Sequence, residues 1–277
     1  MNVINEKNIL NNQDVKYLNL IITVFIISRI FYYFAGVKME VFLGAWQFYP
    51  SELLIEDLLR TIFYGFSQPP LFNLFAGISL KLGGAESQQY LGNFQFIWQV
   101  TFWIFGLFTH VTIYKLCNLL FLNPKKSFYI SLIFMVLPTT LLFENHGYKD
   151  YVTFSFLVYL IYFSLLSIEN DKTYNYFMIS ISIVFLCLWR ETFHIIFAYV
   201  FVLYEYTLNK RKKSLIIFLF ITFLVLPFYL KNLVLYERFQ IAGWQYENLT
   251  QKVQYVRKFD KGEYPKLKKI LFKNDEN

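Results

Sequence analysis

The chain has 277 residues, of which 56% are hydrophobic and 22% aromatic, while only 16% are charged. Soluble domains are about 45–50% apolar and about 25% charged, so the composition excludes an ordinary soluble enzyme and indicates a multi-pass membrane protein. A net charge of +7 would suggest nucleic acid binding in a soluble chain. Here it predicts basic cytoplasmic loops that face anionic lipid, and we expect membrane lipid and no nucleic acid as partner.

Cysteine and histidine usage gives no sign of a metal centre. Cys117 and Cys187 both lie in apolar runs, where a thiol behaves as a small hydrophobe. The histidines His110, His146 and His194 are far apart and lack metal-ligand spacing, so no metal site is predicted. The cofactor is unknown, and a requirement for a divalent metal ion stays open.

The first apolar run, Tyr17–Ala35, follows a polar and neutral segment, residues 1–16. It lacks a small-residue cleavage pattern, so we expect a transmembrane helix rather than a signal peptide. Arg29 lies inside this run. Its side chain either snorkels to the nearer interface or faces the bundle as a ligand for an anion.

A long polar and amphipathic stretch, residues 36–93, comes next. Within it, Ser51 is placed to cap a helix that runs to about Tyr64. One face of this helix is charged and the other apolar, which is typical of a helix that lies on the membrane surface. The predicted apolar face holds Leu54, Leu58, Leu59, Ile62 and Phe63.

Two consecutive prolines, Pro69 and Pro70, interrupt this stretch and allow a helix to begin only at Pro70. The apolar run that follows ends at Leu82, before Gly83 and Gly84. At about 1.5 Å of rise per residue it reaches about 18 Å, which is too short for a hydrocarbon core of about 30 Å. We therefore expect a re-entrant or interfacial helix that lines a site.

Six further apolar runs are interpreted as spans, which makes about seven in all. They are residues 94–114, 128–143, 151–168, 176–189, 193–206 and 215–230. The predicted fold is an all-α, multi-pass transmembrane helical bundle. Residues 1–231 form its membrane module, and 232–277 form an extracytoplasmic tail or truncated loop.

Loop charges predict the orientation. The turns 123–127 and 207–214 carry basic clusters, whereas the loops 36–93 and 144–150 are net acidic. Because basic loops stay in the cytoplasm, we expect a cytoplasmic N-terminus in a bacterial inner membrane. Residues 36–93 are then an extracytoplasmic loop that carries the juxtamembrane and re-entrant helices.

The polar residues of most interest fall on the predicted outer side. Ionisable groups at a membrane boundary are costly, so their default interpretation is functional. Carboxylates beside basic groups suit a reaction that deprotonates a hydroxyl or amine acceptor while Arg and Lys stabilise a phosphate leaving group, as in glycosyl transfer from a lipid-phosphate sugar. The set comprises Glu40, Gln47, Gln68, Asn73, Glu144, Tyr148, Asp150, Arg190, Glu191, His194, Lys231 and Asn232.

Short motifs follow one another along the chain. They are Ser28-Arg29, Glu40, Ser67-Gln68-Pro69-Pro70-Leu71-Phe72-Asn73, Lys81-Leu82-Gly83, Pro138 with Phe143-Glu144-Asn145, Trp189-Arg190-Glu191-Thr192-Phe193-His194, and Pro227 with Lys231-Asn232. In this order they resemble bacterial members of the GT-C glycosyltransferase superfamily, of the mannosyltransferase and aminoarabinose-transferase type. The resemblance covers about residues 20–250.

The resemblance implies a polyprenyl-phosphate sugar donor, an inverting transfer on the extracytoplasmic face, and a glycan, lipid or protein acceptor. It also implies a catalytic carboxylate early in the first outer loop, which Glu40 matches by position. Glu144 matches the acidic residue of the second outer loop, and Arg190 and Lys231 match the positions that hold the donor phosphate.

Two other classes of function stay open. A transporter or flippase would predict an internal repeat or broken helices near mid-membrane, and the Pro-Pro segment has no second copy. A non-catalytic, truncated membrane protein is the other class, because enzymes of this type usually continue for several more helices. A chain that is half of a split enzyme would need a partner subunit.

Overall fold

The structure of the chain is a computed structural model that describes residues 2–45, 47–87, 89–121, 123–169, 172–207 and 211–243. Within these ranges the chain is all helical and has no β-strand, as predicted. The helices are α1 (Asn2–Phe34), α2 (Ser51–Glu56), α3 (Leu58–Tyr64), α4 (Pro70–Leu82), α5 (Phe94–Phe121), α6 (Pro124–Val136), α7 (Pro138–Asn145), α8 (Lys149–Glu169), α9 (Thr173–Trp189), α10 (Ile195–Thr207), α11 (Arg211–Leu224) and α12 (Leu226–Tyr236).

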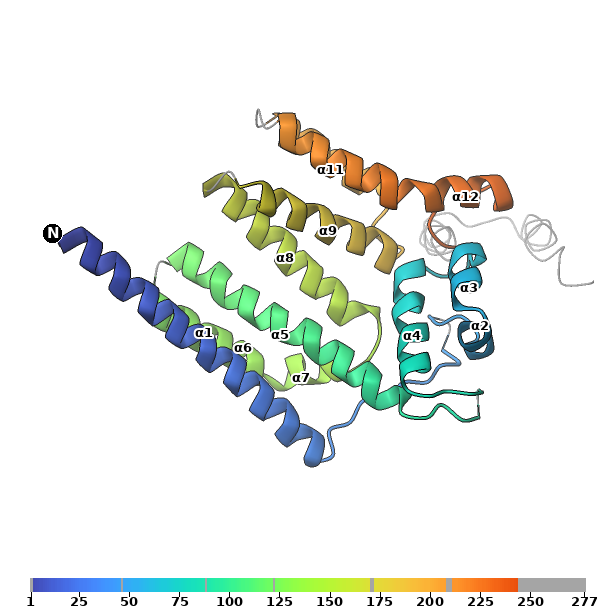
Figure 1. Cartoon of the computed structure of the whole chain (residues 1–277), viewed down its shortest axis with the longest axis horizontal. Helices are drawn as coiled ribbons and strands as arrows, with labels where there is room; N and C mark the ends of the chain where they lie inside the picture. The colour runs from blue at the N-terminus through green and yellow to red at the C-terminus, as the bar shows by residue number, and fades with distance from the viewer. Residues whose placement is uncertain are drawn as a thin grey trace, which may run out of the picture.

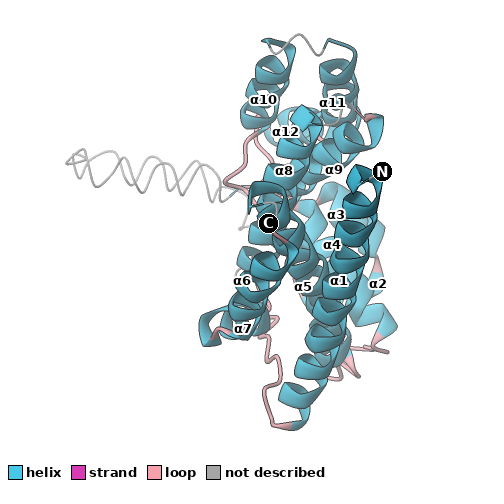
Figure 2. Cartoon of the chain, turned by 90° about the vertical axis from the view of Figure 1, so that its left-hand side faces the viewer, coloured by secondary structure: helices cyan, strands magenta, loops and turns pink. Residues whose placement is uncertain are grey.

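The long helices lie side by side in a bundle, and successive long helices run in opposite directions (Figure 1). Helix α8 packs against α5 and α9, while α1 packs against α5 and α6. Helix α11 lies against α9 and α10, and Figure 2 shows α10 and α11 next to each other at the top of the view. From α5 onwards this antiparallel order follows from the short links between successive helices.

Four helical segments in the described part of the chain are long and apolar enough to cross a membrane. They are Asn12–Phe34, Phe94–Phe121, Lys149–Glu169 and Ser214–Tyr236. The pair α6 and α7 makes a fifth candidate span if it is counted as one segment. The chain is thus an all-helical protein with four or five candidate spans, where the sequence predicts about seven. The other two predicted runs form α9 and α10, which are shorter, with 17 and 13 residues.

The predicted span 128–143 is not one straight helix, because α6 and α7 are bent by 58° at Leu137. Pro138 lacks a backbone N–H, and its ring disfavours the helical conformation of the preceding residue. Leu137 accordingly has an extended backbone, with φ −57° and ψ 129°. The chain therefore turns an elbow here, which brings the end of α7 towards the start of α8.

The predicted surface helix 51–64 is divided into α2 and α3 at Asp57, whose carboxylate accepts a hydrogen bond from the Arg60 N–H at 3.3 Å. Ser51 is not the N-cap; it is the first helical residue after Pro50, and no side chain caps α2. The predicted apolar face is buried at three positions and exposed at two. Leu54, Leu58 and Ile62 are buried, whereas Leu59 and Phe63 are exposed. Each exposed residue lies about 100° around the helix from its buried neighbour, which is outside the packed stripe.

Helix α4 has the predicted bounds, with Pro70 in its first turn and Gly83 directly after its end. A Cβ at Gly83 would lie 2.6 Å from the Phe94 backbone nitrogen, so only glycine allows this close approach to the start of α5. Phe72, Ala76 and Leu80 are fully buried. Helix α4 packs against α2, α3, α5 and α9 and stands across the direction of the long helices (Figure 1).

One end of the bundle gathers the segments that the sequence places in its outer loops. In Figure 1, the starts of α5 and α8 and the end of α9 lie near α4, and the end of α1 lies further away at the same end of the bundle. We call this the loop end; it holds residues 35–93, 146–148, 190–194 and 237–243. The ends of α5 and α8 and the start of α11 lie at the opposite end (Figure 1).

Candidate functional site

Two ion pairs join the start of α8 to the end of α9 at the loop end. Lys149 Nζ lies 3.1 Å from Glu191 Oε2, and Arg190 pairs with Asp150. The first pair is buried, whereas the side chains of the second are about a third exposed, at 31% and 33%. Because both pairs use consecutive residues, two cations and two carboxylates lie next to one another. We call this set the double ion pair.

The Pro-Pro segment contributes Gln68 to this set. Lys149 Nζ donates a hydrogen bond to Gln68 Oε1 at 2.5 Å and lies 5.5 Å from the centre of the Phe72 ring. The Tyr49 hydroxyl donates to the Gln68 carbonyl at 2.7 Å, and burial raises the pKa of Tyr49, which keeps this hydroxyl protonated. Asn73 accepts from the Tyr49 N–H at 2.7 Å. Gln68 thus contacts the charges directly, while Asn73 holds the segment of Tyr49, whose hydroxyl bonds the Gln68 carbonyl.

Two buried indoles fix the backbone before Asp150. Trp98 Nε1 donates to the Gly147 carbonyl at 2.9 Å, and Trp189 Nε1 donates to the Lys149 carbonyl at 3.0 Å. Neither indole ring is exposed to solvent. Since Trp98 lies in α5 and Trp189 ends α9, these bonds set the start of α8 against both neighbouring helices.

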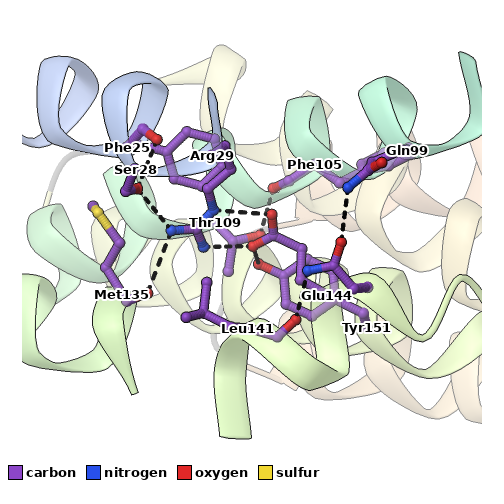
Figure 3. A network of polar contacts seen from close by, with 11 residues as sticks. Phe25, Ser28, Arg29, Gln99, Phe105, Thr109, Met135, Leu141, Glu144 and Tyr151 are labelled. Carbon is purple, nitrogen blue, oxygen red and sulfur yellow. Dashed lines mark hydrogen bonds and ion pairs between the residues drawn. The ribbon is translucent and has the colours of Figure 1, made fainter. Parts of the chain in front are cut away.

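A third ion pair lies deeper in the bundle, between Arg29 of α1 and Glu144 of α7 (Figure 3). Arg29 Nε and Nη2 reach the two carboxylate oxygens at 3.0 and 2.6 Å, and Nη1 reaches Ser28 Oγ and the Met135 carbonyl. The guanidinium also lies 4.2 Å above the Phe25 ring. Arg29 therefore faces the bundle and does not snorkel, because these contacts replace the water that it loses.

The surroundings of Glu144 leave it little freedom. The Tyr151 hydroxyl donates to Oε2 at 3.3 Å, and a Cβ at Gly106 would lie 3.1 Å from the same oxygen.

His110 is fully buried, and neither ring nitrogen has a hydrogen-bond partner in the described part of the chain. Its ring packs between Phe25 and Phe134, with centroids 5.6 and 5.8 Å away.

Glu40 lies at the loop end with its side chain exposed, between the buried residues Met39 and Val41. The Gln95 side chain of α5 bonds both the N–H and the carbonyl of Val41, at 3.0 and 2.8 Å, and Gln99 accepts from Met39 N–H at 3.4 Å. In extended chain, successive side chains point to opposite sides. Glu40 consequently faces away from α5, and it has no ion-pair partner among the described residues.

Three of the predicted site residues make their described contacts with groups outside the double ion pair. Lys231 Nζ donates to the carbonyls of Phe63 and Gly65, at 2.7 and 3.0 Å. Asn232 donates to the carbonyls of residues 240 and 241, at 2.7 and 3.2 Å. The Tyr148 ring packs on His146 at 4.7 Å. Lys231 thereby caps the end of α3 and ties α12 to the turn before the Pro-Pro segment.

His194 packs against two aromatic rings from the last described helix and the segment after it. Its ring centroid lies 5.0 Å from that of Tyr229 and 6.2 Å from that of Phe239. Nδ1 accepts a hydrogen bond from the Ile196 N–H at 3.2 Å. Burial lowers the pKa of His194, which favours the neutral ring and suits this acceptor role.

Sequence reasoning placed Glu191 in the polar set without a role of its own and left out Lys149, although both belong to the double ion pair. A signal was present, because Lys149-Asp150 and Arg190-Glu191 are adjacent opposite charges at the facing ends of neighbouring predicted spans. When two neighbouring antiparallel helices carry such charges at adjacent ends, each cation can pair with the carboxylate of the other helix end. Among the described residues, no group of three His, Cys, Asp or Glu side chains is arranged to hold a metal ion.

Comparison with known proteins gives no match, whether against protein-family models, curated proteins or solved structures. Any inference about the chemistry of the site therefore rests on the residues of the site itself. The site combines an exposed cation, an exposed carboxylate, a buried ion pair and a polar amide at one end of a membrane-type bundle.

Proposed function

We propose that the chain is an integral-membrane glycosyltransferase that moves a sugar from a polyprenyl-phosphate donor to an acceptor at the loop end. The double ion pair carries this proposal. Its partly exposed cation, Arg190, can stabilise a departing phosphate, while Asp150 and the buried pair of Lys149 and Glu191 hold that cation in place. Gln68 and Arg190, which belong to separate motifs of the GT-C resemblance, both lie in or against this set.

Arg190 is the proposed ligand of the donor phosphate. Its guanidinium is partly exposed and already held by Asp150, so it is oriented before a ligand arrives. A lipid-linked phosphate would share or replace the Asp150 contact. Lys149 has a supporting role, because its ammonium is buried between Gln68 and Glu191 and fixes the geometry of the neighbouring pair.

The transfer step needs one base and one leaving group. The acceptor oxygen or nitrogen attacks the sugar C1, the bond from C1 to the phosphate oxygen breaks, and the phosphate leaves with the bonding electrons. We propose Glu40 as the base that takes the acceptor proton, because it is the exposed carboxylate at the loop end that matches the first-loop position of the resemblance. Glu144 has both oxygens engaged by Arg29 and Tyr151, so we propose that it orients α7 and α1 instead.

The proposed topology has about seven crossings of a bacterial inner membrane, with a cytoplasmic N-terminus. In it α4 is re-entrant at the extracytoplasmic loop end. The helices α9 and α10 have 17 and 13 residues and reach only about 26 and 20 Å, so their crossings include residues that adjoin these helices. The acidic loops 36–93 and 144–150 and the basic turns 123–127 and 207–214 support this orientation. The acceptor, whether glycan, lipid or protein, then approaches from outside the cell.

The test is a transfer assay with the full chain in nanodiscs. A panel of undecaprenyl-phosphate-linked hexoses and pentoses is supplied with a crude membrane extract as acceptor source, and the release of undecaprenyl phosphate is measured. We expect release from at least one donor, with loss of release in the Arg190→Ala variant. Equal release by the parent and by empty nanodiscs across the panel would overturn the proposal.

A transporter or flippase is the second candidate, and one observation favours it. The elbow between α6 and α7 breaks a candidate span, and a groove of about 290 Å³ lies beside it. The groove is lined by Phe134, Thr139, Thr140, Phe143, Tyr151 and Phe154. Broken helices are typical of transport pathways. This candidate predicts that proteoliposomes move the lipid-linked sugar between leaflets without cleaving it.

A further inference from the structure

The two halves of the double ion pair differ in how easily they can open. The side chains of Lys149 and Glu191 are only 3% and 7% exposed, and separating them would leave two unpaired charges away from water. Arg190 and Asp150 are about a third exposed, so each can turn towards water when its partner is replaced. An anion that enters the site from outside can therefore displace Asp150 but not Glu191.

Arg190 also keeps donor groups for a second anion. A guanidinium has five N–H donors, and Arg29 uses Nε, Nη1 and Nη2 in four hydrogen bonds within the bundle. In contrast, the Arg190 side chain makes one hydrogen bond to a described residue, from Nη1 to Asp150 Oδ1. Every nitrogen of the Arg29 guanidinium is thus engaged, whereas Nε and Nη2 of Arg190 have no partner in the described part of the chain.

The backbones on both sides of this contact are held in place. Trp189 Nε1 donates to the Lys149 carbonyl at 3.0 Å, directly before Asp150. The Arg190 N–H donates to the Leu186 carbonyl at 3.1 Å, which continues the hydrogen-bond pattern of α9 into Arg190. A rotation of the Asp150 side chain alone is then enough to free the guanidinium.

We propose that Asp150 is the resident anion of a phosphate site on Arg190, and that a phosphate displaces it in order to bind. The double ion pair holds two cations and two carboxylates, so it is neutral as it stands. A phosphate that binds beside Asp150 places two anions on one guanidinium, whereas a phosphate that replaces Asp150 avoids this repulsion. The phosphate is that of the lipid-linked donor, which makes this role of Asp150 dependent on the proposed function.

Two possible roles of Asp150 predict opposite effects on affinity. A side chain that only orients Arg190 helps a phosphate to bind, so its loss weakens binding. A resident anion competes for the same N–H groups, so its loss strengthens binding. An exposed ion pair shifts an equilibrium by up to about fivefold, which sets the scale of the gain.

The test is calorimetric titration of the full chain in detergent micelles with two probes, farnesyl phosphate and inorganic phosphate. Asp150→Asn should bind farnesyl phosphate about two- to fivefold more tightly than the parent does, and Asp150→Ser repeats the test with a second side chain. Asp150→Glu keeps the charge and should stay near the parent value. The gain should disappear in Asp150→Asn/Arg190→Ala. Glu56→Gln is the matched control, because it removes the same charge from the exposed surface of α2.

The two probes identify the source of the phosphate. A gain with both supports a site that recognises the phosphate group alone, and a gain with farnesyl phosphate only supports a site that also needs the lipid chain. A gain with inorganic phosphate only overturns the proposal, because the site then excludes the lipid-linked donor.

Equal or weaker binding of farnesyl phosphate by Asp150→Asn also overturns the proposal. The proposed function then stands if the parent still releases undecaprenyl phosphate in the transfer assay and Arg190→Ala does not. Failure of both probes to bind the parent and the Asp150 variants overturns the phosphate site on Arg190 itself, and the transfer assay decides separately whether the chain is a glycosyltransferase.

Discussion

Arg29 and Glu144 are 115 residues apart in the sequence, and their side chains form a bidentate ion pair that is almost completely buried. Removing one partner from such a pair leaves an uncompensated charge in an apolar environment. We predict that Glu144→Gln lowers the free energy of unfolding by about 3–5 kcal/mol. The measurement is the temperature at which the purified protein loses its monodisperse elution peak.

The control is the double variant Arg29→Met/Glu144→Met, which removes both charges and should be less destabilised than Glu144→Gln. A Glu144→Gln protein that elutes like the parent but has no transferase activity would instead give Glu144 the catalytic role that its position in the resemblance implies.

Glu40 should be important for turnover and unimportant for folding, because its side chain is exposed. A positioned carboxylate base typically contributes about 10²–10⁴-fold, so Glu40→Gln should reduce kcat by that factor with KM for the donor nearly unchanged. Glu56→Gln, an exposed carboxylate in α2, is the matched control. If Asp150→Asn is inactive while Glu40→Gln turns over at the parent rate, the base belongs to the double ion pair.

Arg190 should act on donor binding. Arg190→Ala removes a charge-assisted contact and should raise KM for the lipid-linked sugar by about tenfold or more. Arg190→Lys keeps the charge but not the planar fork, and it should recover part of the affinity. The measurement is the rate of transfer as the donor concentration is varied, for the parent and the variants in nanodiscs. An unchanged KM in an active Arg190→Ala protein would move the phosphate site elsewhere.

We predict that Lys231 stabilises the turn before the Pro-Pro segment. Lys231→Met removes two hydrogen bonds to the carbonyls of Phe63 and Gly65. We predict faster amide hydrogen exchange in residues 63–68, with exchange in the core of α8 unchanged. Slower turnover with normal exchange would instead support the phosphate role that the sequence gave Lys231.

The topology can be checked with single cysteines. Ser67→Cys lies at the loop end and Lys212→Cys in the basic turn 207–214, so a membrane-impermeant maleimide added to intact cells should label residue 67 only. Both should be labelled once the membrane is permeabilised. Labelling of both positions in intact cells would contradict the proposed orientation.

The bounds of α4 could be predicted from sequence because local chemistry determines both of its ends. Pro70 can occupy the first turn but not the interior of a helix, and Gly83 follows the last helical residue. Pro138 carried a similar local signal, but the apolar run around it is continuous and predicted one span. The elbow at Leu137 shows that the restriction on the residue before proline prevailed.

The partners within the site were not predictable in the same way. Pairing of Lys149 with Glu191 rather than Asp150 depends on how α8 and α9 are rotated against each other, which no local pattern encodes. The outward direction of Glu40 depends on Gln95, a side chain that lies 55 positions further along the chain and bonds both backbone groups of Val41. Sequence order therefore indicated which residues come to the loop end, but not which of them touch.

The bonds from Lys231 to the turn after α3 also bear on how the chain is made. Lys231 follows Phe63 by 168 residues, and at about 5–20 residues per second the ribosome needs roughly 10–30 s to reach it. During that interval α4 has left the ribosome, whereas Lys231, which bonds the turn before α4, has not yet been synthesised. The Pro-Pro segment must therefore first fold without the bonds from Lys231, and its final position against α12 is reached late in biosynthesis.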